Sequence, residues 1–69
     1  MKDWQQRLLD EKAGLELKIN NLNKFVPYHD NFIELSTQDQ ALLKTQLDIM
    51  KAYMAILNAR IVSYNIEEK

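Results

Sequence analysis

The sequence predicts an all-α fold: an antiparallel two-helix hairpin with a short capping connection, which assembles into a helical homo-oligomer. Apolar residues recur every three or four positions in both halves of the chain, the spacing of an apolar face on an α-helix. Pro27 separates the two patterns, and short connections join helices that pack antiparallel. We therefore expect one domain over residues 1–69, with helix one at about 4–26, a connection at 27–36 and helix two at about 37–64.

Helix two carries two apolar stripes, and the second stripe predicts self-association. A single neighbouring helix cannot cover both stripes, so we expect helix one on one side and another subunit on the other. A chain of this length also buries only a modest core, and small domains often rely on oligomerisation. The first stripe is Leu43, Leu47, Met50, Met54, Leu57, Ile61 and Tyr64, and the second is Leu42, Ile49, Tyr53 and Ile56.

Helix one has a plainer pattern with one charged interruption. Asp3 followed by Gln6 resembles a capping box, and Pro27 predicts that the helix ends near Phe25 or Val26. Lys12 falls where the stripe expects an apolar residue. It either keeps its ammonium in water above a buried stem or points into a pocket shared between subunits. The stripe itself is Leu8, Leu15, Ile19, Leu22 and Val26.

The connection is expected to close one end of the hairpin. Phe32, Ile33 and Leu35 should fold back onto the two helices, as one helical turn. Ser36 should cap helix two, because a serine hydroxyl accepts a hydrogen bond from a free backbone N–H of the first turn. Past helix two, the tail Asn65–Lys69 is expected to fray.

Composition excludes several classes of protein. There is no cysteine and only one histidine, His29, so a disulfide framework is excluded and a metal site is not expected. Nine Lys plus Arg against ten Asp plus Glu argue against a duplex-DNA binder. We expect no membrane segment, no signal peptide, no cofactor and no catalytic residues, since no phosphate loop or catalytic constellation is present. The protein is therefore predicted to be a non-enzymatic, intracellular one.

Antiparallel pairing predicts which polar and aromatic residues lie at the same level. Arg7 should lie near the level of Arg60, Trp4 close to Ile61 at the open end, and Lys12 level with Tyr53. Gln46 should lie beside Lys18. Cations beside aromatic rings suit a nucleotide, which offers phosphate charge and flat bases. On these residues alone, ordinary interface packing is favoured over ligand binding, because aromatic residues are enriched at interfaces.

The residues also resemble a known family of small phage proteins. The resemblance covers residues 4–61, and the parts that helical periodicity does not require are Arg7 with Glu11, and Gln46, Met50, Tyr53 and Arg60. The full pattern is Arg7, Glu11, Leu15, Ile19, Leu22, Phe25, Phe32, Leu35, Gln40, Leu43, Gln46, Met50, Tyr53, Leu57, Arg60 and Ile61. It is similar to the helical hairpin domain shared by anti-CBASS and anti-Thoeris signal sponges.

This resemblance implies a compact homo-oligomer, with a hexamer favoured, that works in the host cytoplasm. Such proteins bind cyclic oligonucleotides made by bacterial immune synthases, in pockets between subunits, and so withhold the signal from its effector without any reaction. Some relatives place an aromatic residue in a longer N-terminal arm, and some carry an extra domain. Only residues 1–3 precede Trp4 in this sequence, so we expect that aromatic contact to be missing or to come from Trp4 itself, and we expect no extra domain. Carried onto this chain, the resemblance implies phosphate contacts from Arg7, Lys12 and Arg60, base stacking by Trp4 and Tyr53, and a hydrogen bond from Gln46.

Two other functions stay open on the sequence. A purely structural hairpin that brings partner proteins together would show the same two stripes on helix two. A dimeric hairpin that binds structured RNA would need a clustered basic face, which nine scattered cations supply poorly.

Overall fold

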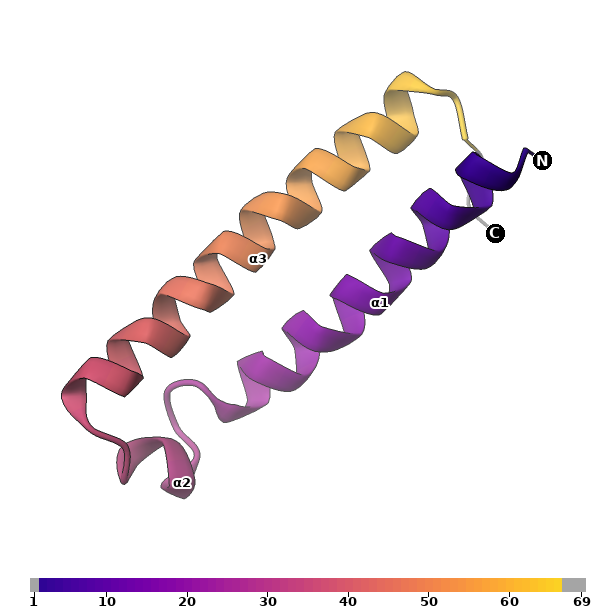
Figure 1. The fold of residues 1–69 in the computed structure, drawn as a ribbon. Helices are drawn as coiled ribbons and strands as arrows, with labels where there is room; N and C mark the ends of the chain where they lie inside the picture. The colour runs from indigo at the N-terminus through magenta and orange to yellow at the C-terminus, as the bar shows by residue number, and fades with distance from the viewer. Residues whose placement is uncertain (1, 67–69) are drawn as a thin grey trace.

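The computed structural model describes residues 2–66 and contains three helices: α1 (Asp3–Phe25), α2 (Asp30–Ile33) and α3 (Thr37–Ser63). Figure 1 shows α1 and α3 lying side by side and antiparallel, with α2 at the closed end and the start of α1 beside the end of α3 at the open end. The hairpin is a rod measuring 46 × 16 × 15 Å. The predicted all-α hairpin is confirmed, while its assembly into an oligomer stays a prediction. No helix within residues 2–66 is both long enough and apolar enough to cross a membrane.

The start of α1 differs from the prediction by one residue. Lys2, not Asp3, is the N-cap, and its extended backbone places Asp3 inside the first turn. The backbone N–H of Lys2 donates to Oε1 of Gln5 at 2.9 Å, while Gln6 donates instead to Asp10 at 2.9 Å. The predicted Asp3–Gln6 capping box is therefore wrong, because the neighbouring glutamine provides the bond one residue earlier. At its other end α1 stops at Phe25, as predicted.

The connection folds into a single helical turn that plugs the closed end. Phe32 is buried, and its ring lies edge-on to that of Phe25 at 5.8 Å between centroids. His29 caps α2 by accepting a hydrogen bond at Nδ1 from the N–H of Asn31, at 3.1 Å. Ile33 does not fold inward and stays 60% exposed. Consecutive residues on a helix point about 100° apart, so a turn this short can bury Phe32 or Ile33 but not both.

Gln40 ties the connection to α3. Its side-chain Nε2 donates toward three backbone carbonyls of the turn, those of Phe32, Ile33 and Leu35, at 3.1–3.2 Å. Carbonyls at the end of a short helix have no partner within the helix, so a side-chain donor satisfies them here. Ser36 caps α3 as predicted, accepting from the N–H of Asp39 at 3.1 Å.

α3 ends in a capping motif that the sequence prediction missed. Asn65 adopts a left-handed backbone (φ 55°), which asparagine tolerates better than most residues. The N–H of Ile66 reaches the carbonyl of Ile61 and that of Asn65 reaches Val62, both at 3.1 Å, the two bonds of a Schellman motif. Ile66 is buried as a result. The predicted fraying is wrong for Asn65 and Ile66, and residues 67–69 lie outside the described part of the chain.

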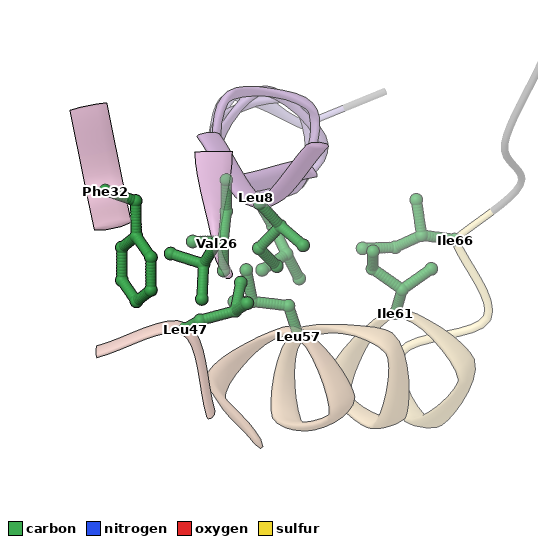
Figure 2. Close-up of a cluster of buried hydrophobic side chains, with 9 residues drawn as sticks. Leu8, Val26, Phe32, Leu47, Leu57, Ile61 and Ile66 are labelled. Atoms are coloured by element: carbon green, nitrogen blue, oxygen red, sulfur yellow. The ribbon is translucent and has the colours of Figure 1, made fainter. Parts of the chain in front are cut away.

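The core is one narrow layer of side chains between α1 and α3 (Figure 2). Leu57 is its most enclosed member, with no exposed surface. The first stripe of α3 faces this layer as predicted, except at Tyr64, which follows the last helical residue and stays 43% exposed. The buried apolar residues within 2–66 are Leu8, Leu15, Ile19, Val26, Phe32, Leu47, Leu57, Ile61 and Ile66.

Replacement of Gln40 by glutamate should destabilise the hairpin. The carboxylate has almost the same shape but cannot donate, and it would face three carbonyl oxygens. We expect a loss of about 1–3 kcal/mol in the free energy of unfolding, measured by urea titration at one protein concentration. Gln38→Glu is the matched control, since Gln38 is exposed and its replacement adds the same charge to the same turn of α3. Equal effects from the two variants would show that the Gln40 bonds contribute nothing.

Candidate functional site

At the open end of the hairpin, two predicted site residues, Trp4 and Arg60, both lie against the ring of Tyr64. The rings of Trp4 and Tyr64 meet edge to face, with centroids 5.0 Å apart and planes at 88°. The guanidinium carbon of Arg60 lies 5.9 Å from the centroid of the Tyr64 ring. They meet because Trp4 opens α1 and Tyr64 closes α3, and antiparallel helices bring those ends to one level. Trp4 and Tyr64 remain 45% and 43% exposed, so both rings offer surface to a ligand.

Tyr64 is the residue that sequence reasoning misplaced. Its spacing assigned it to the core-facing stripe of α3, although the helix ends one residue earlier. The prediction that Trp4 lies close to Ile61 already placed Trp4 near the ring of Tyr64. A cation within about 6 Å of an aromatic face is held by the ring's quadrupole, so Tyr64 positions Arg60 at the open end.

Gln46 lies in a groove between the helices, beside Lys18 as predicted. Its Nε2 is 3.9 Å from Sδ of Met50. The groove measures about 360 Å³, within the range of small-molecule sites, and combines an ammonium and two amides with apolar walls. Its lining consists of Lys18, Asn21, Leu22, Phe25, Gln46 and Met50.

Tyr53 and Arg60 continue the line of Gln46 along one edge of α3. Positions 46, 53 and 60 are seven residues apart, or nearly two full turns, so they share one edge of the helix. All three side chains are exposed. Arg7 is also exposed and lies about one turn beyond Trp4 on α1. Five of the six predicted site residues are therefore available to a ligand on the surface of the hairpin.

Lys12 is the exception, because it lines a different groove. Positions 12 and 18 are about 120° apart around α1, so Lys12 points to the side of the hairpin opposite Lys18 and Gln46. It is half-buried. At the level predicted for Lys12, the residue of α3 that lines its groove is Met54, the neighbour of Tyr53 in the sequence. Its groove measures about 320 Å³ and is lined by Lys12, Glu16, Ile19, Lys51, Met54 and Asn58.

The Lys12 groove has a neighbour of about 350 Å³ toward the closed end. Lys51 lines both hollows, and Lys44 and Asp48 join it in the second. Mixed charges of this kind neutralise one another locally, so this side of the hairpin is not a simple basic surface. Within residues 2–66, no group of three or more His, Cys, Asp or Glu side chains is arranged to hold a metal ion.

Comparison with known proteins gives two findings. A sequence profile of the family described as Sequestin matches residues 2–63, almost the whole chain. A protein of Enterobacteria phage T4, described as an uncharacterized 7.5 kDa protein in the denB-rIIB intergenic region, is 38% identical over 61 residues. That alignment covers 88% of this chain and 94% of the T4 protein. No solved structure matches the hairpin.

Substitution of Tyr64 by alanine should change the surroundings of Trp4, the single tryptophan of the chain. Loss of the edge-on ring gives water access to the indole. We expect its fluorescence emission to shift several nanometres to longer wavelength and acrylamide quenching to rise. Tyr28→Ala is the control, because Tyr28 is 83% exposed at the closed end and should leave emission unchanged. Identical spectra for Tyr64→Ala and the native chain would contradict the Trp4–Tyr64 contact.

Proposed function

Because this chain belongs to the Sequestin family and is a phage protein, we propose that it is a stoichiometric sponge for cyclic oligonucleotide immune signals. In this proposal a homo-oligomer, with a hexamer favoured, binds cyclic di- or trinucleotides in pockets between subunits. The captured signal no longer reaches its effector in the host cytoplasm, which blocks CBASS-type defence. The protein performs no reaction and needs no cofactor.

One observation supports the proposal most strongly: an amide, an aromatic ring and a guanidinium lie in a row along a single exposed edge of α3. Gln46, Tyr53 and Arg60 supply these groups, and the Trp4 ring adds a second aromatic surface beside Arg60 and Tyr64. A nucleotide presents matching groups, since its phosphate accepts charge-assisted hydrogen bonds and its base stacks on rings. Amides such as that of Gln46 bond to base edges or ribose hydroxyls.

The shape of the grooves supports a pocket shared between copies. Sites for small ligands bury about 70–90% of the ligand surface. The Gln46 groove between the two helices is open to solvent, and the rod is only 15–16 Å thick. A single hairpin can therefore cover one side of a ligand but cannot enclose it. A symmetric assembly would complete the enclosure and repeat the same residues around a ligand that is itself made of repeated units.

Lys12 takes a separate part in this proposal. Since it lies on the other side of the hairpin from Gln46, one ligand cannot contact both residues of the same copy. Phosphate contacts within one copy fall to Arg7 and Arg60. Lys12 would contribute only where a second hairpin brings its own groove against the first.

A second candidate function is a structural hairpin that assembles without a ligand. The observation that favours it is the exposed second stripe of α3, where Leu42, Ile49 and Ile56 remain 58–63% exposed. The apolar surface of another protein copy is enough to cover that stripe, so no ligand is needed. This candidate predicts assembly but no response to nucleotides. An RNA-binding dimer has no such support, because the net charge of the chain is −1.

Calorimetric titration with a panel of cyclic di-, tri- and tetranucleotides tests the proposal. We expect at least one to bind tightly and the Arg60→Lys variant to bind it about tenfold more weakly, the loss of roughly one charge-assisted hydrogen bond. Lysine keeps the positive charge but lacks the planar fork that matches a phosphate.

Lys24→Ala is the matched control, because Lys24 is exposed near the end of α1 that lies away from Trp4 and Arg60. It removes a whole charge and should leave affinity within twofold. Absence of heat and of any thermal shift across the entire panel would refute the sponge and leave the structural candidate.

A further inference from the structure

The backbone at the end of α3 fixes the place of Tyr64. Tyr64 follows the last helical residue, and its N–H still reaches the carbonyl of Arg60 at 2.9 Å. The left-handed Asn65 and the Schellman bonds then turn the chain back, so that Ile66 is buried. Tyr64 is therefore held between the last helical turn and a residue of the core, although 43% of its own surface is exposed.

The Tyr64 ring lies against two groups that suit a nucleotide. The indole of Trp4 meets the ring edge to face at 5.0 Å, and the guanidinium carbon of Arg60 lies 5.9 Å from the ring centroid. Trp4 is fixed from its own side, because it lies in the first turn of α1, which Lys2 and Gln5 cap. One ring thus holds an aromatic surface and a cation next to each other, and both are exposed.

We propose that Tyr64 is the positioning residue of a subsite for one nucleotide, formed at the open end by residues of a single hairpin. The Trp4 indole stacks on the base, and the Arg60 guanidinium donates hydrogen bonds to the phosphate of the same nucleotide. Only a ribose separates the base from the phosphate within one nucleotide, which matches two groups held against one ring. The inference rests on the proposed function for its ligand class, but no second copy contributes to these contacts.

Arg7 gives this subsite a second cation. It follows Trp4 by three residues, so the two side chains are neighbours on the surface of α1, and both are exposed. Arg7 therefore adds positive charge on the α1 side of the indole, as Arg60 does on the α3 side. Positive charge beside a surface on which bases stack is the arrangement that binds single nucleic-acid strands without strict base preference.

Tyr64 contributes by ordering the two groups that contact the ligand. A flexible side chain that becomes fixed on binding loses conformational entropy, which weakens affinity. The Tyr64 ring already restricts the Trp4 indole and the Arg60 guanidinium before a ligand arrives. Loss of this ring should therefore weaken binding even though the stacking and charged groups both remain.

Titration with adenosine monophosphate, followed by NMR, tests the subsite, because this method detects weak binding at single side chains. In the native chain we expect the indole N–H signal of Trp4 and the Nε–H signal of Arg60 to move together. Trp4 is the single tryptophan, so its indole signal is unambiguous. Adenosine offers the same base without a phosphate and should bind more weakly, and this difference measures the contribution of the charged groups.

Tyr64→Leu should weaken binding of adenosine monophosphate about fivefold or more, the effect of losing the order of two side chains. Its preference for the monophosphate over adenosine should also fall, whereas a general loss of structure would weaken both ligands equally. Tyr64→Phe keeps the ring and should restore the preference. Tyr28→Leu is the matched control, since Tyr28 is 83% exposed at the closed end and should leave binding as in the native chain.

Asn65 provides a second test that leaves every contact group in place. Its backbone is left-handed (φ 55°), a conformation that glycine adopts readily and a β-branched residue does not. Asn65→Gly should therefore bind as the native chain does. Asn65→Val should disturb the turn that holds Tyr64 and lose the preference for the monophosphate, as Tyr64→Leu does.

Two results would overturn the inference: a Trp4 signal that does not move with adenosine monophosphate, or an unchanged preference for the monophosphate in Tyr64→Leu. Both are independent of the calorimetric panel. Binding of adenosine monophosphate without binding of any cyclic nucleotide would refute the sponge alone. Binding of a cyclic nucleotide that leaves the Trp4 signal unmoved would refute the subsite alone.

Discussion

A single layer of apolar side chains between α1 and α3 holds this protein together. Leu57 is enclosed on all sides, whereas Leu15 and Ile19 each keep 9% of their surface exposed. Hydrogen bonds close both ends of this apolar layer. Gln40 links the connecting turn to α3, and the Schellman motif places Ile66 over the open end. Two helices can bury only the sides that they turn toward each other, so the apolar residues on the outside of α3 remain uncovered.

That geometry links the fold to the candidate site. The core fixes the rotation of α3, and this rotation decides which residues lie inward, outward and along the edge. Leu47 and Ile61 turn inward, Ile49 and Ile56 outward, and Gln46, Tyr53 and Arg60 occupy the edge between them. An assembly that covers the exposed residues Leu42, Ile49 and Ile56 would therefore border the polar and aromatic edge. Binding of a nucleotide and association of copies would then involve one and the same region of α3.

The sequence predicted the helices and their inward faces well, because the 3.6-residue period depends only on which side chains are apolar. It was less reliable wherever one residue decides the outcome. Asp3 was chosen as a cap although Gln5 bonds to Lys2, and Tyr64 continued the spacing of the core stripe past the last helical turn. Lys12 was predicted only to be level with Tyr53, and the α3 residue that lines its groove at this level is Met54 and not Tyr53. The level of a residue along the hairpin follows from the register of the two helices. The side of the hairpin on which it lies depends on the rotation of each helix about its axis, which packing alone sets.

The proposed function depends on self-association of the hairpin, because Leu42, Ile49 and Ile56 on α3 remain 58–63% exposed in a single copy. Sedimentation equilibrium of the purified protein without ligand, at micromolar concentration, measures this most directly. If the hairpin self-associates as proposed, the measured mass should be a multiple of the 8.2 kDa chain. A stable monomer of 8.2 kDa with native helix content would contradict it.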